Sequence, residues 1–138
     1  MADYTFTWHG RARKAELLAA VKGGIDETMA VAVGIAKAKV PVRTAILQGS
    51  IQMRPATIRG GIVTGLWGSF QVNYALYVHE GTRPHIIRPR TKKALFWKGA
   101  AHPVKLVHHP GTKPNRFLSE AADIAYPGLP GRVSKRLP

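Results

Sequence analysis

The chain begins with an alternation of aromatic and polar side chains and continues with a long stretch of helical spacing. Tyr4, Phe6 and Trp8 are separated by threonines, and this period of two is typical of a strand with one buried face. From Ala12 to Lys39 the apolar residues recur every three or four positions, which predicts a helix with one apolar stripe. The stripe consists of Leu18, Val21, Ile25, Met29, Ala32 and Ala36.

Two adjacent glycines interrupt this helical pattern. Gly23 and Gly24 each cost a helix about 1 kcal/mol relative to alanine, so the sequence predicts a kink or two separate helices there. Asp26 and Glu27 favour a new helix start, because acidic groups are stabilised at helix N-termini. Pro41 ends the helical region, since the residue before a proline disfavours the helical conformation.

Residues 29–38 are small and apolar on nearly every side of the predicted helix. Such a segment can pack on two sides at once, against a sheet and against a neighbouring subunit, and burial in the chain's own core explains it equally well. From this segment and the C-terminal region we predict contacts between subunits. The predicted oligomer contacts are Val31, Val33, Ile35, Tyr126, Leu129 and Arg132.

The middle of the chain consists of short apolar segments separated by glycines. Residues 45–53 are predicted as a short helical or extended piece within a connection, and residues 58–72 as two strands. Turn signals occur at Gly60–Gly61 and at Gly65. These signals place the second strand at residues 68–72.

Residues 73–79 form either a short helix or the end of a strand. We favour the helix, because it gathers two tyrosines and Val78 on one face. The chain must then reverse at Gly81, for which we predict a positive φ, and Pro84 fixes the next corner. Short strands are predicted after this corner, at residues 85–87, 94–97 and 104–108.

A final helix is predicted from Pro114 to Ala125, and the sequence Tyr126-Pro127-Gly128 stops it. The remaining residues contain two more prolines, so we expect either disorder or an arm that lies on a partner. A length of 138 residues fits one domain. We therefore predict a single α+β domain over residues 1–126 and an extended tail over 127–138. A long N-terminal helical segment and a C-terminal helix would pack on a small, mainly antiparallel sheet.

The net charge of +14 is large for this length and favours a polyanionic partner, although a solvated lysine-rich surface is the simpler alternative. No acidic residue occurs between Glu80 and Glu120. Residues 88–93 place four cations in a loop that Pro84 and Pro89 stiffen. We predict that this loop faces DNA or a partner through Arg83, Arg88, Arg90, Lys92, Lys93 and Lys98.

The composition also excludes several classes of protein. The chain has no cysteine, which excludes disulfides and thiolate metal sites. No apolar run approaches the roughly 20 residues that span a bilayer, and the first residues lack the pattern of a signal peptide. We expect synthesis in the cytosol and no membrane partner.

Histidine motifs suggest a metal site, and we predict that none is present. His79-Glu80 begins like the zinc-protease motif His-Glu-x-x-His, but Arg83 stands at the position of the second ligand. His108 and His109 would point to opposite faces of a strand, so together with His102 they do not form a three-ligand zinc site.

A nuclease is a further chemical alternative. His79, Glu80, His85 and Arg88 lie within ten residues of one turn and include the types needed for a base, an acid and a phosphate clamp. The chain has only seven acidic residues, and none are paired at a spacing suited to two-metal chemistry. A structural turn capped by Glu80 explains the same cluster. We therefore predict no catalytic residues and no cofactor, and a turn formed by Glu80, Gly81, Thr82 and Pro84.

A series of short motifs follows a specific order along the second half of the chain. They are Tyr74-Ala75, Tyr77-Val78, Glu80-Gly81-Thr82, a Pro-rich basic loop, Ala94 to Trp97, His109-Pro110-Gly111, Pro114 and Phe117-Leu118. This series resembles the small neck or tail-completion protein of long-tailed, non-contractile bacteriophages, a minor component of the head–tail junction. Residues 40–45 and Ser50-Ile51 resemble that family's Pro-x-x-Thr-Gly turn and Ser-Ile pair, with Ala45 where the family usually has glycine, so the resemblance covers most of the chain.

The resemblance implies a structural virion protein without catalytic activity. It would form a homo-oligomeric ring in the neck, with sixfold symmetry favoured over twelvefold. Its neighbours would be a head-closure or adaptor protein and a tail-terminator or tail-tube protein, and double-stranded DNA would pass through the channel with non-specific contacts. Two alternatives stay open: a basic nucleic-acid-binding domain that acts alone, and a small nuclease.

Overall fold

The computed structural model describes residues 7, 9–43 and 45–138, so the predicted strand at 4–8 lies outside the described residues except for Thr7. The chain forms two compact units. The first, which we call the helical unit, combines the chain up to Val72 with Phe117–Pro138. The second, Asn73–Arg116, we call the basic unit. The single domain predicted for residues 1–126 is therefore divided, because residues 73–116 pair mainly among themselves.

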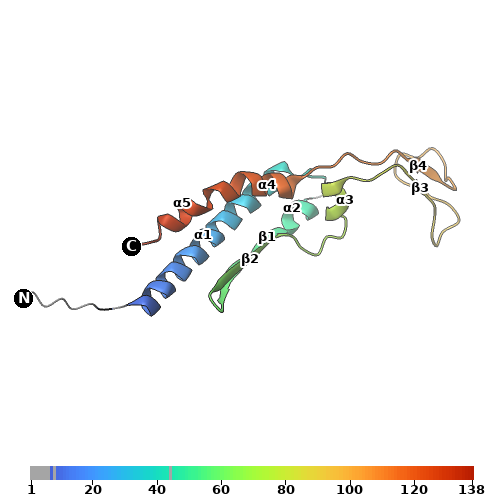
Figure 1. Cartoon of the computed structure of the whole chain (residues 1–138). Helices are drawn as coiled ribbons and strands as arrows, with labels where there is room; N and C mark the ends of the chain where they lie inside the picture. Colours follow the sequence, from blue (N-terminus) through green and yellow to red (C-terminus); the bar gives the residue numbers. More distant parts are fainter. Residues whose placement is uncertain (1–6, 8, 44) are drawn as a thin grey trace, which may run out of the picture. The chain divides into compact units, whose positions relative to one another are not determined.

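The fold is α+β, as predicted, with a long N-terminal helix, C-terminal helices and small antiparallel sheets. Helix α1 (Gly10–Lys39) is the centre of the helical unit. It contacts the C-terminal helices and both strands of a hairpin, which lie along different sides of it (Figure 1). No helix in the described part of the chain is both long and apolar enough to cross a membrane.

Helix α1 continues through Gly23 and Gly24, where a kink or two separate helices were expected. A Cβ at Gly24 would lie 2.5 Å from Cγ2 of Val133, and one at Gly23 would lie 2.6 Å from Nε of Arg136. The glycines therefore allow the C-terminal segment to approach α1 closely, and this packing offsets their low helix propensity. The helix ends before Pro41, as predicted.

Helix α2 (Ile46–Ser50) leads directly into strand β1 (Ile51–Arg59), which pairs antiparallel with β2 (Ile62–Ser69). The turn predicted at Gly60–Gly61 is confirmed, with φ of 56° and 80°. Positive φ at both turn residues matches the right-handed twist of a tight hairpin.

Two predictions about the hairpin are wrong. Gly65 lies inside β2 instead of forming a turn. A Cβ at this position would lie 2.6 Å from Sδ of Met29, so glycine is needed to leave room for that side chain. The second strand also begins at Ile62, not at residue 68. The register shifts between Arg54 and Thr57, which indicates a β-bulge. Pro55 lies at this bulge and has no backbone N–H for the strand pairing.

The core of the helical unit contains many small side chains and a few large ones. Phe117 and Ile51 are the largest fully buried side chains. The buried positions of α1 are mostly small, which permits close packing of helix on helix and helix on hairpin. The buried residues of α1 are Ala20, Gly24, Thr28, Met29, Ala32 and Ala36.

The C-terminal region is helical as far as Ser134. Helix α4 (Phe117–Ala125) is followed by the 3₁₀ turn η1 (Tyr126–Gly128) and helix α5 (Leu129–Ser134). The predicted extended tail over 127–138 is therefore wrong. Pro130 lies in the first turn of α5, where a missing N–H costs nothing. Helix α5 packs on α1, and this contact supplies the stability that its short sequence lacks.

The basic unit contains one helix and a two-stranded sheet. Helix α3 (Ala75–Glu80) confirms the helix favoured for residues 73–79. Strand β3 (His85–Ile87) pairs antiparallel with β4 (Val107–His109). The strands expected at 94–97 and 104–108 are reduced to an isolated bridge between Leu95 and Val104 and to the β4 residues.

Candidate interaction surface

Two glycines close the basic unit. Gly81 has a φ of 72°, which confirms the predicted positive value, and Gly111 has a φ of 84°. A Cβ at Gly81 would lie 2.5 Å from the carbonyl oxygen of Thr112, and a Cβ at Gly111 would collide with the carbonyl oxygen of Thr82. Thr82 and Thr112 donate backbone hydrogen bonds to each other over 3.0 Å. The backbone at these two points therefore approaches too closely for any side chain.

The other predicted turn residues lie at the same closure. The hydroxyl of Thr82 is 3.1 Å from that of Thr112 and also accepts the Thr112 N–H. The carboxylate of Glu80 contacts Nδ1 of His79 at 2.9 Å and does not cap the turn. That part of the prediction is wrong, because adjacent side chains at the end of α3 already satisfy each other.

Two stacked histidines lie beside the closure, His85 after Gly81 and His109 before Gly111. His85 and His109 face each other across β3 and β4, with ring centroids 4.9 Å apart. Nδ1 of His85 donates to the carbonyl oxygen of Arg83, and Nδ1 of His109 accepts the N–H of Gly111. Together with both neighbouring prolines they line a shallow recess of about 410 Å³. Sequence reasoning did not identify this pair, because the pairing depends on the register of β3 and β4.

The same strand pairing places His108 opposite Ile86 and not beside His85. Within the described residues, no group of three His, Asp or Glu side chains is arranged to hold a metal ion. His108 also lines the recess, so three imidazoles border it, and the Nδ1 atoms of His85 and His109 already bond to the backbone.

All six predicted contact cations of the basic loop are exposed, and none of them forms an ion pair with a described residue. Elsewhere in the described chain, ion pairs such as Lys39–Glu120 and Lys22–Asp26 join cations to carboxylates. The loop therefore carries six exposed cations with no ion pair to a described residue, in a segment without acidic residues between Glu80 and Glu120. These cations are Arg83, Arg88, Arg90, Lys92, Lys93 and Lys98.

The basic unit also exposes large apolar side chains. Phe96 is 67% exposed and Trp97 is 50% exposed, and both lie next to the basic loop. The only buried hydrophobic residue among those described in this unit is Ala75. The unit is thus held by backbone pairing rather than by a hydrophobic core. Its exposed large apolar residues are Tyr74, Leu76, Tyr77, Ile86, Ile87, Phe96, Trp97 and Leu106.

The predicted oligomer contacts lie in the helical unit with mixed exposure. Val31, Val33 and Ile35 are half-buried on α1, and Leu129 is half-buried on α5. The remaining two already have partners in their own chain. The hydroxyl of Tyr126 accepts the indole N–H of Trp67 at 2.9 Å, and Arg132 donates to Thr28 and to the carbonyl oxygen of Ala125.

Carboxylates fix the elements of the helical unit to one another. Glu27 accepts a hydrogen bond from Arg136 at 2.7 Å, and this bond is the main reason that its pKa lies below the ordinary value. Asp26 accepts the N–H of Ala56 at 2.6 Å. Its desolvation raises the pKa, but the bonds from Ala56 and Lys22 together lower it. The two carboxylates thus join α1 to α5 and to the bulge of β1.

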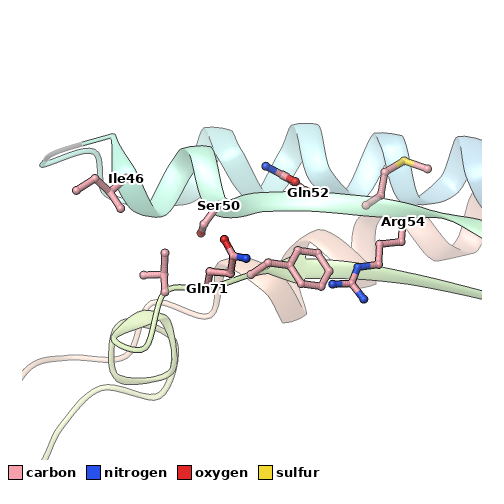
Figure 2. Close-up of a pocket in the computed structure, with 8 residues that line it drawn as sticks. Ile46, Ser50, Gln52, Arg54 and Gln71 are labelled. Atoms are coloured by element: carbon pink, nitrogen blue, oxygen red, sulfur yellow. The ribbon is translucent and has the colours of Figure 1, made fainter.

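A second recess of about 370 Å³ lies in the helical unit. Figure 2 shows its lining side chains, which come from α2, from β1 and from the segment after β2. The guanidinium of Arg54 lies 4.7 Å from the centre of the Phe70 ring. Sequence reasoning did not identify this recess, because its walls meet only through the hairpin register.

Two residues beside this recess have left-handed backbone. Ala45, which precedes α2, has a φ of 59°, and Gln71, which follows β2, has a φ of 62°. The turn at Ala45 thus has the conformation that glycine would favour, although an alanine occupies it. Such positions store strain that the surrounding packing must offset.

Comparisons of this chain with protein-family models, with curated proteins and with solved structures found no match.

Proposed function

We propose that this chain is a structural protein of the head–tail junction of a long-tailed, non-contractile bacteriophage, located in the neck of the virion. The observation that carries the proposal is the closure at Gly81 and Gly111. The Glu80-Gly81-Thr82 and His109-Pro110-Gly111 motifs, which carry much of the resemblance, meet there through the Thr82–Thr112 pair. A backbone frame of this kind presents exposed side chains to neighbouring molecules, as a ring component requires.

In this proposal the subunits form a ring, most simply sixfold, around the channel that double-stranded DNA crosses. One neighbour is a head-closure or adaptor ring, and the other is a tail-terminator or tail-tube ring. Helix α1 supplies a surface for contacts between subunits, because Ala30, Gly34 and Ala38 are exposed on it at four-residue spacing. Small side chains at this spacing let a neighbouring backbone approach closely.

Native mass spectrometry and electron microscopy of the purified protein test this proposal. A particle of six chains of 15.1 kDa each, with a central pore, is the expected result. Phages that lack the protein should accumulate DNA-filled heads and separate tails. A protein that stays monomeric at all concentrations and is absent from purified virions contradicts the proposal.

The second candidate is a basic nucleic-acid-binding domain that acts alone, and the unpaired cations of the basic loop favour it. Binding of this kind is independent of sequence and weakens steeply with salt. A monomer with high affinity for duplex DNA and no role in joining heads to tails would support this candidate against the ring.

A further inference from the structure

The charge of the basic unit has no counterpart within the chain. Residues 73–116 contain nine lysines or arginines and a single acidic residue, Glu80. That glutamate already contacts His79. This unit therefore fits a negatively charged partner, which would replace the solvent counter-ions around its cations.

The exposed apolar side chains set a second requirement for the partner. Trp97 and Phe96 stand beside Lys98 and the cations of residues 88–93. Aromatic residues next to arginines are the types that dominate the binding energy of protein interfaces. A partner that offers only charge would leave these rings in water, so the surface fits a partner with both acidic and apolar groups.

A second copy of this chain does not meet these requirements. Each copy carries 21 cations and seven acidic residues. Glu16, Asp26, Glu27 and Glu120 already pair with cations of the helical unit. Among the described acidic residues only Asp123 forms no ion pair. One unpaired carboxylate among the described residues of each copy cannot neutralise the basic loop of its neighbour.

Duplex DNA meets only the first requirement. It supplies phosphates for lysine and arginine, but stacking on exposed aromatic rings needs unpaired bases. Apolar wedges can enter a bent minor groove, but this requires the DNA to be kinked. A protein groove with an acidic rim accommodates both features of the surface without deformation.

We infer that the basic unit docks into an apolar groove with an acidic rim on a different protein. Phe96 and Trp97 enter the groove, and the cations of residues 88–93 contact the rim. The inference rests on the proposed function only in that the neighbouring ring of the neck would supply this groove. It thereby names the chemistry of that neighbour.

Three labelled probes test the inference by fluorescence anisotropy with the full chain. The first is a peptide in which Asp and Glu alternate with Leu and Phe, the second is polyglutamate of the same net charge, and the third is a short DNA duplex. The wild-type protein should bind the mixed peptide about tenfold more tightly than polyglutamate, since buried aromatic anchors contribute most of an interface's energy.

The paired substitution Phe96→Ser and Trp97→Ser should reduce binding of the mixed peptide to the level of polyglutamate and leave duplex binding unchanged. The matched control is Ile58→Ser with Ile62→Ser, which removes two apolar side chains that are 41% and 68% exposed on the hairpin. This control should bind all three probes as the wild type does. Circular dichroism checks that both variants keep their helices.

A second pair of variants tests whether the partner must be negatively charged. Replacing Arg88, Arg90, Lys92 and Lys93 with serine should weaken binding of both peptides. The control replaces four exposed cations of the helical unit with serine and should weaken it far less. The four control residues are Arg11, Lys14, Arg43 and Arg59.

Two results would overturn the inference. The first is equal affinity of the wild type for the mixed peptide and for polyglutamate. The second is duplex binding that falls when Phe96 and Trp97 are replaced, without any preference for the mixed peptide, which would assign the surface to nucleic acid. Failure of the proposed function is separately visible as the absence of a ring and of the protein from virions, with the peptide preference intact.

Discussion

Gly81 and Gly99 have similar left-handed φ values, 72° and 100°, but different surroundings. A Cβ at Gly99 meets nothing within 4 Å, whereas one at Gly81 meets the carbonyl oxygen of Thr112. Gly81→Ala should therefore destabilise the closure by about 1 kcal/mol or more through backbone strain alone, with the collision adding to this. Gly99→Ala should show the strain only.

Hydrogen exchange at the Thr82 and Thr112 amides measures this difference, because both amides donate across the closure. Exchange should be faster in the Gly81 variant than in the Gly99 variant. Equal rates in the two variants would show that the close approach at Gly81 has no energetic consequence.

Gly24 and Gly34 provide a second contrast, both lying in α1. Alanine in a helix is normally more stable than glycine by about 1 kcal/mol, and Gly34→Ala should show this gain because its Cβ meets nothing within 4 Å. Gly24→Ala should instead lower the free energy of unfolding, since the new methyl group collides with Val133.

Thermal unfolding gives the sign of both changes. Adding Val133→Ala to Gly24→Ala should recover part of the loss, because it removes the Cγ2 atom that collides. A stabilised Gly24→Ala protein would mean that α5 is free to move away from α1.

At the scale of single residues, the features that could be predicted are those that depend only on neighbours in the sequence. The positive φ of Gly81 follows from a helix that must reverse before Pro84. The role of Gly24 depends on Val133, which is distant in the sequence, so propensity alone suggested a break where close packing occurs. For the same reason the stacking of His85 on His109 could not be foreseen.

The attachment of α5 to α1 should depend on pH. Hydrogen bonding to Arg136, with attraction by Arg132 and Lys135, lowers the pKa of Glu27 from 4.5, although slight desolvation opposes this. Because the folded-state pKa is lowered, the stabilisation is fully present above pH 4.5 and is lost as the pH falls through the lower folded-state value. Exchange of the α5 amides, corrected for intrinsic rates, should therefore accelerate over this range.

Glu27→Gln should remove this acceleration and make α5 exchange faster already at neutral pH. Glu16→Gln is the matched control, because Glu16 pairs with Arg13 inside α1 and not with α5. An unchanged pH profile in the Glu27 variant would assign the attachment to apolar packing alone.

Most elements with a strong periodic pattern or turn signal could be predicted, namely the hairpin turn, α3, α4 and, apart from the break expected at its two glycines, α1. Gly65 was misassigned as a turn because glycine in a strand and glycine in a turn look alike in sequence. Helix α5 was missed because its prolines suggested an extended chain, while the ion pairs with Glu27 that hold it are visible only in the structure.

For the whole molecule, assembly into a ring should protect the exposed side of α1. Hydrogen exchange of residues 30–38 should slow in assembled particles relative to the isolated chain, because neighbouring subunits would cover Ala30 and Gly34. The segment around Leu17, which is 47% exposed near the start of the helix, serves as an internal reference. Identical exchange of residues 30–38 in both states would exclude this surface as a subunit contact.

The fold class and the exposure of the basic loop could be predicted from composition and spacing, because both follow from the character of many residues together. The division into two units could not, since it depends on which backbone groups pair. The exposure of Phe96 and Trp97 could not be predicted either. An aliphatic–aromatic segment is usually buried, but residues 73–116 form no core that could enclose it.

The closure at Gly81 and Gly111 has a consequence for how new binding specificities can arise on this scaffold. Thr82 and Thr112 pair through their backbones, so the frame does not depend on the identity of most side chains between them. The segment it encloses can therefore be exchanged, lengthened or grafted as a cassette, provided that both glycines are kept. A change of partner would then require no redesign of the helices that fold the rest of the chain.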